Sequence, residues 1–318
     1  MTLHDQASDP GATAGRVAPD PVPLQPAAPE VSITTVGCVV LSMGDRPVEL
    51  RRALDSLLRQ RGVTVRVLVV GNGWAPGELP EGVDSMTLTE NVGIPEGRNI
   101  GAAAVDGEVL LFLDDDAALD DDDTLLRAVR LFEAEPTIGA MQPQIKDFDG
   151  QVTPSRWVPR LRAIGRDRAG DVTVLWEGVS LVRRSAFERI GGWAGVFFYG
   201  HEGIELSWRM IDAGYRVWYA ADITALHPAT LPTRHRYFYV QTARNRVWVA
   251  RRNLPLPVAA TYLVIWSTAT VLRTRNLTQL RDALTGFGRG FREPCGTRRP
   301  ISYGAVWRMT RAGRPPIV

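Results

Sequence analysis

Lysine and cysteine are scarce in this 318-residue sequence, which contains one lysine, Lys146, and two cysteines, Cys38 and Cys295. Two cysteines so far apart provide neither a disulfide framework nor the spacing of a metal site, so we expect a reducing, cytoplasmic environment. Excess charge is also lacking, because the formal net charge is only +2. A chain without a strong positive field is not expected to bind nucleic acid.

A secretory signal is lacking as well. Residues 1–30 have neither a basic start nor an apolar centre. Their content of Pro, Ala, Gly and Asp is typical of a disordered leader, and we expect the folded domain to begin at residue 31. The chain as a whole has 45% hydrophobic and 23% charged residues, which is enough to bury a sizeable core.

Apolar runs that predict buried strands alternate with helical patterns in the first half of the chain. Strands are expected at 34–43, 65–74 and 108–116, and helices at 46–62, 96–107 and 123–136. This alternation predicts an α/β domain whose mostly parallel sheet has helices on both faces. Residues 141–170 are rich in Pro and Arg, and we interpret them as loops. Residues 202–227 are expected to form a helix and then a strand that ends at His227.

Three consecutive aspartates, Asp114 to Asp116, stand at the carboxyl end of one expected strand, where ligands of such sheets bind. Side chains alternate along a strand, so Asp114 and Asp116 point the same way and can share a divalent cation, whereas Asp115 reaches another neighbour. Carboxylate oxygens suit Mg²⁺ or Mn²⁺, and a cation would offset the repulsion among the three groups. An exposed acidic turn is the other interpretation, and we apply it to residues 120–123.

Several motifs occur in a fixed order between Thr34 and His227. In chain order they are "VVLSMGDRPVELRRALDSLLRQ", "VLVVGNGW", "NVGIPEGRNIGAAAVDGEVLLFLDDDA", "GVSLVRRSAFERIGGW" and "GHEGIELSWRMIDAGYRVWYAADITALH". Together they resemble family 2 glycosyltransferases, the inverting sugar-nucleotide enzymes of the GT-A fold, and a bacterial, rhamnosyltransferase-like subgroup within them. The resemblance implies a Rossmann-like GT-A domain, which we place at residues 31–232. The sequence pattern after Pro232 predicts C-terminal helices at 233–286, and its charge predicts a basic tail at 287–318.

The resemblance also implies a metal site and a donor site. Asp114 and Asp116 match the family's DXD pair, which binds Mn²⁺ or Mg²⁺ on the donor diphosphate, with Asp114 and Asp115 also beside the donor. A histidine at the position of His227 completes the metal shell in several GT-A enzymes, although a lone histidine is often structural. Arg98 would lie near the diphosphate or the carboxylates, with Asn99 next to it.

The turn that contacts the nucleotide base in the family is matched by Asn72. Gly71 departs from the pattern, because the family usually has an aspartate there that reads uracil. This departure leaves the nucleotide open, with Asp45 or Asp84 as candidate replacements. The predicted partners are a nucleoside-diphosphate sugar and a hydroxyl acceptor, which is a glycan, a lipid-linked molecule or a small molecule of cell envelope glycan biosynthesis.

Inverting transfer needs a carboxylate that takes the proton of the acceptor hydroxyl. The family supplies it from an "E-D-x-D/E-L" run, which corresponds here to "HEGIEL" at 201–206. One alignment places Glu202 on the family's base and the other places Gly203 there, and glycine cannot act as a base. Glu202 is therefore the predicted base and Glu205 the fallback, although Glu205 also has the (i, i+4) spacing of a structural pair with Arg209.

On the acceptor side, the resemblance points to Trp176, Glu177 and His201. An aromatic face can stack on the apolar face of a sugar. Trp176 is equally well interpreted as part of the core, and His201 as an ordinary loop histidine.

Residues 254–272 carry no charge and are followed by an arginine-rich segment. A run of this length with two prolines is marginal for a membrane span. We expect a helix that lies in the interface at the inner face of the cell membrane, with the basic tail on anionic lipid, and the other interpretation is a buried packing helix. In the membrane interpretation the acceptor is lipid-linked, and Arg244 and Asn245 would meet its phosphate.

Two other functions fit parts of the sequence. A nucleotidyltransferase has a similar sheet and carboxylate–metal site, but it needs a Gly-rich loop with Lys or Arg directly after the first strand, which "SMGDRP" matches poorly. A catalytically inactive scaffold that only binds nucleotide sugar would account for Gly71 and for the displaced base motif.

Overall fold

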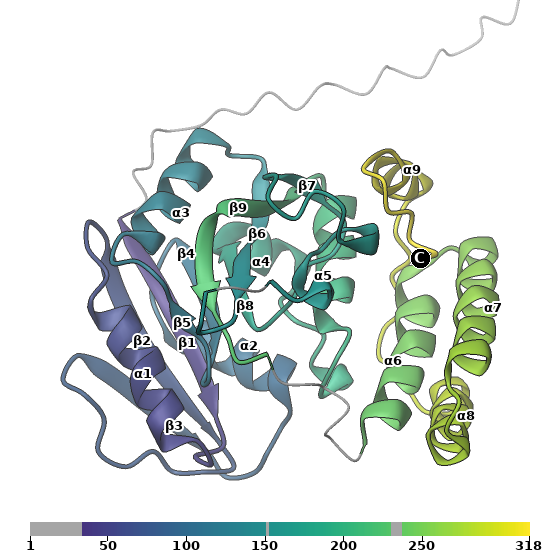
Figure 1. Ribbon diagram of the computed structural model, residues 1–318, viewed down its shortest axis with the longest axis horizontal. Coiled ribbons are helices and arrows are strands. Elements are labelled where there is room, and N and C mark those ends of the chain that lie inside the picture. The colour runs from purple at the N-terminus through teal and green to yellow at the C-terminus, as the bar shows by residue number, and fades with distance from the viewer. Residues whose placement is uncertain (1–33, 151–152, 230–236) are drawn as a thin grey trace, which may run out of the picture. The chain divides into compact units, whose positions relative to one another are not determined.

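The computed structural model describes residues 34–150, 153–229 and 237–318 (Figure 1). The leader expected at residues 1–30 and the domain boundary expected at 232/233 both lie outside the described residues. Within the described ranges, the first strand begins at Thr35 and the last helix ends at Arg311.

A single mixed sheet forms the centre of the described chain. Its strands are β1 (Thr35–Ser42), β2 (Thr64–Asn72), β3 (Val83–Leu88), β4 (Val109–Asp114), β5 (Ala118–Leu119), β6 (Ile138–Lys146), β7 (Gly170–Val172), β8 (Val179–Arg183) and β9 (Arg216–Leu226), in the order β3-β2-β1-β4-β8-β6-β9-β5, with β7 paired to β9. The strands β1, β2 and β4 are parallel, as expected, and β3, which the sequence did not predict, adds a further parallel strand beside β2. β8 runs antiparallel to both β4 and β6, so the sheet as a whole is mixed.

Helices cover both faces of this sheet. One face carries α1 (Pro47–Leu58) and α3 (Thr124–Ala134), and the other carries α2 (Ile94–Ala104), α4 (Arg184–Ile190) and α5 (Glu202–Asp212). β1 shows why both faces are apolar, since Val36, Cys38 and Val40 pack on the α1 side and Val39 packs on the α2 side. A strand covered on both faces reads as an unbroken apolar run, which is the pattern seen in the sequence.

Residues 141–170, which the sequence indicates to be mostly loops, begin with regular structure, because β6 extends to Lys146. Pro143 obscured this strand in the sequence, and the structure places it at a register shift against β9, where proline is tolerated. The remainder has two short 3₁₀ turns, η1 (Ser155–Trp157) and η2 (Leu161–Ala163), and a third, η3 (Gly195–Phe197), precedes α5.

After β9, the part of the chain that the structure describes contains four helices: α6 (Phe238–Asn253), α7 (Leu256–Arg273), α8 (Leu277–Arg292) and α9 (Tyr303–Arg311). α6 packs on α5 and on η3, where the rings of Phe197 and Trp248 meet edge to face with centroids 5.9 Å apart. The segment expected as a basic tail at 287–318 contains the end of α8 and all of α9, and Ala305 and Met309 of α9 are fully buried. This basic segment is therefore folded onto the domain.

Candidate metal and donor site

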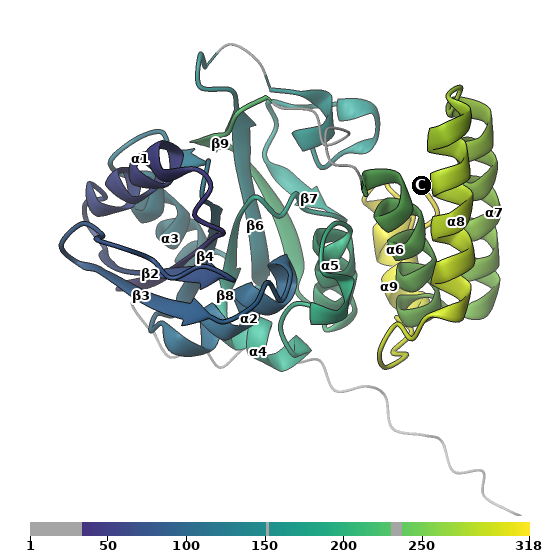
Figure 2. The same ribbon diagram turned by 90° about the horizontal axis from the view of Figure 1, so that it is seen from below.

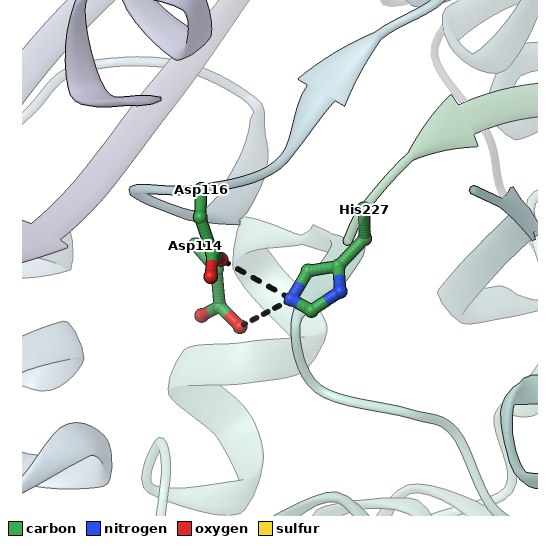
Figure 3. Close-up of side chains that lie close together, drawn as sticks. All are labelled: Asp114, Asp116 and His227. Carbon is green, nitrogen blue, oxygen red and sulfur yellow. Dashed lines mark ion pairs between the residues drawn. The ribbon is translucent and has the colours of Figure 1, made fainter. Parts of the chain in front are cut away.

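Two carboxylates and one imidazole meet at the carboxyl ends of β4 and β9 (Figure 3). Asp114 is the last residue of β4, Asp116 lies in the turn that follows, and His227 comes directly after β9. Their ligand atoms all lie within 4.8 Å of one another. Nε2 of His227 is 3.2 Å from Oδ1 of Asp116 and 3.9 Å from Oδ2 of Asp114. The structure thus brings together the three residues expected as metal ligands.

The ring of His227 is held in a fixed orientation. Its Nδ1 lies 2.8 Å from the carbonyl oxygen of Pro228, and Nδ1–H donates to that oxygen when the ring is neutral. The lone pair of Nε2 then faces the two carboxylates, as in histidines that bind metals. Trp157 and Trp176 contact the ring edge-on, with centroids 5.2 Å and 4.9 Å away. Two carboxylates and an oriented imidazole form a donor set that suits Mn²⁺, and Mg²⁺ through the carboxylates.

Two arginines flank the carboxylates. Nη2 of Arg98 donates to Oδ1 of Asp114 at 2.7 Å, and Arg98 is only 1% exposed. Arg46 pairs with Oδ2 of Asp116 and lies 3.2 Å from Oδ1 of Asp115. Burial raises the pKa of Asp114, whereas Arg98 and His227 lower it. The site thus combines buried negative charge with cations that face it from two elements.

Asp115, in the turn that follows β4, has a hydrogen-bond partner of its own. Its Oδ2 accepts a hydrogen bond from Oγ of Ser42 at 2.7 Å, and Asp115 is buried. Burial raises the pKa of Asp115 to about 6, although Arg46 and the Ser42 hydrogen bond lower it. Ser42 and Arg46 were not among the predicted site residues. Both stand at the carboxyl end of β1, next to β4 in the sheet, which is the signal that could have identified them.

Two residues expected at the donor, Asn72 and Asn99, make hydrogen bonds within the protein. Asn72 donates from Nδ2 to Asn91 and accepts at Oδ1 from the backbone N–H of Val92. Asn99 donates to the carbonyl oxygen of Trp193 at 2.9 Å and accepts from its N–H at 2.8 Å. Each side-chain amide therefore donates one hydrogen bond and accepts another, and both bonds stabilise a loop beside the site.

The structure explains why glycine occupies position 71. A Cβ atom there would collide with the carbonyl oxygen of Trp74 and with the ring of Pro76, so this turn has no room for an aspartate. Of the two candidate replacements, Asp45 lies 3.7 Å from Arg46 and is close to the site. Asp84 pairs in register with Leu68 in the middle of β2, away from the carboxyl end of the sheet.

The predicted base, Glu202, begins α5 and is 1% exposed, and its Oε2 has no hydrogen-bond partner among the described residues. Burial raises the pKa of Glu202, and burial followed by the charge of Glu202 raises the pKa of Glu177. Arg98 lowers the pKa of both groups and Asp114 raises it, so the two glutamates share one electrostatic environment with the cluster.

Packing requires glycine at position 203. A Cβ atom at Gly203 would lie 2.5 Å from the carbonyl oxygen of Leu175 and 2.6 Å from Oε2 of Glu177. His201, the preceding αL residue with φ of 72°, turns the chain into α5. Burial, with a smaller effect of Arg246, lowers the pKa of His201 to about 3, so its ring is neutral.

The fallback base, Glu205, belongs to a buried ion network. It is fully buried and accepts from Nε of Arg209 at 2.9 Å and from Nδ2 of Asn253 at 3.0 Å, with Arg252 3.4 Å away. Carboxylate oxygens engaged by two arginines and an amide are not available to take a proton. This arrangement favours Glu202 as the base.

The residues expected to meet a lipid phosphate support the loop before α5 instead. Nη2 of Arg244 donates to the carbonyl oxygen of Phe197 at 3.0 Å. Nδ2 of Asn245 lies 2.8 Å from the carbonyl oxygens of both Tyr199 and Gly200. α6 thereby holds in place the segment that leads to Glu202.

Residues 38–191 match the family model described as Glycosyl transferase family 2. No curated protein matches the sequence. The matched range contains Asp114, Asp116, Arg98 and Glu177 and ends before α5 and β9.

Solved structures of glycosyltransferases share the fold at low sequence identity. GalNAc-T7 with UDP, GalNAc and Mn²⁺ is 16% identical with a TM-score of 0.57, over 83% of this chain and 57% of that chain. The mannosyltransferase PcManGT from Pyrobaculum calidifontis with GDP-Man and Mn²⁺ is 18% identical with a TM-score of 0.52, over 89% of this chain and 81% of that chain. S. aureus TarS 1-349 with UDP-GlcNAc is 15% identical with a TM-score of 0.57, over 82% of this chain and 81% of that chain. The chain thus spans little more than half of the GalNAc-T7 structure. At these identities the comparison establishes the GT-A fold.

Proposed function

Because the chain belongs to glycosyl transferase family 2 through residues 38–191, we propose that it transfers a hexose from a nucleoside-diphosphate sugar to a hydroxyl acceptor with inversion at the anomeric carbon. The cluster of Asp114, Asp116 and His227 carries this proposal. It lies at the carboxyl ends of strands, where sheets of this kind bind nucleotides.

Metal dependence is part of the proposal. Mn²⁺ or Mg²⁺ held by Asp114, Asp116 and His227 would supply a Lewis acid that neutralises charge on the leaving diphosphate. Arg98 and Arg46 already pair with the same carboxylates, and each guanidinium has the fork geometry that binds phosphate oxygens. We propose that these two arginines contact the diphosphate once the carboxylates bind the cation.

Glu202 is proposed as the general base. The acceptor O–H bond breaks, its proton goes to the carboxylate, and the oxygen forms the new bond to the anomeric carbon while the sugar–phosphate bond breaks. The electron pair of the broken bond leaves with the nucleoside diphosphate. A pKa raised by burial suits this role, because an efficient base has a pKa near the working pH. Glu177, with Trp176 before it, would line the acceptor side.

The relatives with known donors use different nucleotides, since GalNAc-T7 and TarS were solved with uridine nucleotides and PcManGT with GDP-Man. With Gly71 in place of the usual aspartate, base recognition in this chain would depend on other groups. Of the two candidate acids, Asp45 and Asp84, Asp45 lies nearer to the site.

A thermal-shift screen of UDP-, GDP- and dTDP-sugars with and without Mn²⁺ tests the proposal. We expect one nucleotide series to stabilise the protein only with Mn²⁺ and the same donor to be hydrolysed slowly without acceptor. Pyrophosphate release would instead identify a nucleotidyltransferase. Binding without any turnover, with acceptor present, would identify an inactive scaffold.

The acceptor is proposed to be a lipid-linked intermediate of cell envelope glycan synthesis, reached at the inner face of the membrane. The support is α7, an 18-residue helix long and apolar enough to cross a membrane by length and composition, of which only 11% is buried. A transfer assay that compares a short-chain water-soluble acceptor with its long-chain lipid form tests this choice, and equal rates would argue against it.

A further inference from the structure

The helices α7 and α8 present large apolar side chains to solvent. Figures 1 and 2 show the two helices side by side, on the far side of α6 from α5. The exposed side chains, called here the outer apolar set, are Leu256 (73% exposed), Val264 (67%), Leu272 (75%), Leu277 (81%), Leu284 (53%) and Phe291 (57%). Apolar surface gathered in this way marks an interaction site more often than scattered single residues do.

α7 is attached to the protein along one side. Ala259 and Tyr262 are buried, and the Tyr262 ring lies edge-on to Trp208 with centroids 6.1 Å apart. The guanidinium of Arg246 lies 3.6 Å from the centroid of Trp266 on the same helix. A helix that packs on the domain and covers an arginine in this way cannot be surrounded by lipid. The side of α7 that faces away from the domain can instead lie in a membrane interface.

α8 has an amphipathic pattern of the same kind. Leu277, Leu284 and Phe291 are seven residues apart and follow one line along the helix, opposite Gly286 and Gly290, which are buried against α6. A shallow groove of about 550 Å³ follows this line, lined by Leu277, Leu280, Leu284, Arg281, Arg289 and Arg292. Apolar side chains and guanidinium groups therefore line the same groove, and Arg289 also pairs with Glu293.

The positive charge of the segment around α8 favours an anionic partner. From Arg273 to Glu293, the segment that contains α8, there are five arginines and two acids, Asp282 and Glu293. A second copy of the chain on this surface would place like charges against one another. An anionic surface would instead pair with the guanidinium groups while the leucines and Phe291 leave water.

We propose that the outer sides of α7 and α8 dock the protein on an anionic lipid bilayer, with the outer apolar set among the acyl chains and the arginines of α8 at the lipid phosphates. The helices lie in the interface and do not cross it. The proposed contact is wider than the membrane segment predicted from the sequence, residues 254–272 with the basic tail, because α8 takes part in it along its length. Docking does not depend on sugar transfer, so each proposal can fail alone.

Co-sedimentation of the full chain with lipid vesicles tests docking. We expect binding to vesicles that contain phosphatidylglycerol to be about tenfold or more stronger than to phosphatidylcholine vesicles, and to weaken as salt is raised. The double variant Leu284→Glu, Phe291→Glu should lose at least about tenfold in binding, because two apolar contacts become two repelled charges. Both side chains are exposed, so the fold should tolerate the change.

Val48→Glu is the matched control, since Val48 is 75% exposed on α1 and should leave binding unchanged. Donor binding with Mn²⁺ should persist in all variants and shows that the site is intact. Equal binding of the parent to both vesicle types, or parent-level binding by the double variant, would overturn the proposal. A concentration-dependent dimer that the double variant abolishes would assign the surface to a second copy instead.

Discussion

Asn245 of α6 donates its side-chain amide to the carbonyl oxygen of Gly200, 2.8 Å away, in the loop that leads to Glu202. The same Nδ2 atom lies 2.8 Å from the carbonyl oxygen of Tyr199, and Asn245 is fully buried. Residues 199 and 200 form no regular backbone ladder, and this amide donates to the carbonyl oxygens of both. The C-terminal helices thus determine the position of the proposed base.

Asp116→Ala should abolish Mn²⁺-dependent donor binding, because the cluster loses one of its two carboxylate ligands. Titration calorimetry with UDP- and GDP-sugars, with and without Mn²⁺, measures the effect. Asp120→Ala is the matched control, since this exposed acid follows in the same acidic stretch and is expected to change nothing. A metal-dependent affinity that survives Asp116→Ala would exclude this residue as a ligand.

Glu202→Gln should leave donor binding intact and lower the transfer rate by about 10² to 10⁴-fold, the usual contribution of a general base. Glutamine keeps the size of the side chain but accepts no proton from the acceptor. Steady-state transfer assays, with donor affinity measured in parallel, provide the comparison. If the variant transfers sugar at the parental rate, another group takes the proton, and Glu177 is the first to examine.

Glu205→Ala should destabilise the fold by about 3–5 kcal/mol, because it leaves the charges of Arg209 and Arg252 buried without their partner. Urea unfolding monitored by tryptophan fluorescence measures the loss. The control is Glu188→Ala, whose side chain is 64% exposed and lies 3.7 Å from Arg184. A surface pair of this kind is worth about 0–1 kcal/mol. Equal effects of the two variants would contradict the assignment of Glu205 to a structural network.

His201 should make the fold sensitive to mild acid. Its pKa of about 3 in the folded protein lies below the value of about 6.5 in the unfolded chain. Between these values the unfolded chain binds the extra proton, so the stability contributed by this residue is fully present above pH 6.5 and falls as the pH falls. Between pH 7.5 and 5 the loss should be about 1 to 2 kcal/mol.

His201→Asn tests this expectation, because asparagine tolerates the αL conformation at φ of 72° and does not titrate. The free energy of unfolding, measured by urea at pH 7.5 and pH 5, should decrease less in the variant than in the parent. Identical decreases would mean that the titrating group is elsewhere.

The metal cluster was predictable because it depends on local rules. Asp114 ends an apolar strand, Asp116 lies in the turn directly after it, and His227 directly follows another strand whose carboxyl end meets the same edge. The fold was predictable for a related reason, since helical and strand patterns alternate clearly from residue 34 to 136. Pro143 within β6 shows where this reasoning fails, because tolerance for proline depends on the register of the partner strand.

The contacts that the sequence did not reveal join segments far apart in the chain. Asn72 and Asn99 were predicted only as donor contacts, and their hydrogen bonds to Val92 and to the backbone of Trp193 join segments that only the folded chain brings together. Trp157, which packs against His227, lies in a 3₁₀ turn within a region of no clear periodicity. Hydrogen bonds between a side chain and a distant backbone group produce no recognisable pattern in a single sequence.

The amide of Asn245 has a kinetic consequence if α7 and α8 rest on lipid. α6 then connects the bilayer to the proposed base, and the protein meets a lipid-linked acceptor by lateral diffusion in two dimensions. Turnover should follow the number of acceptor molecules per unit area of vesicle and should slow when inert lipid dilutes them at constant bulk concentration.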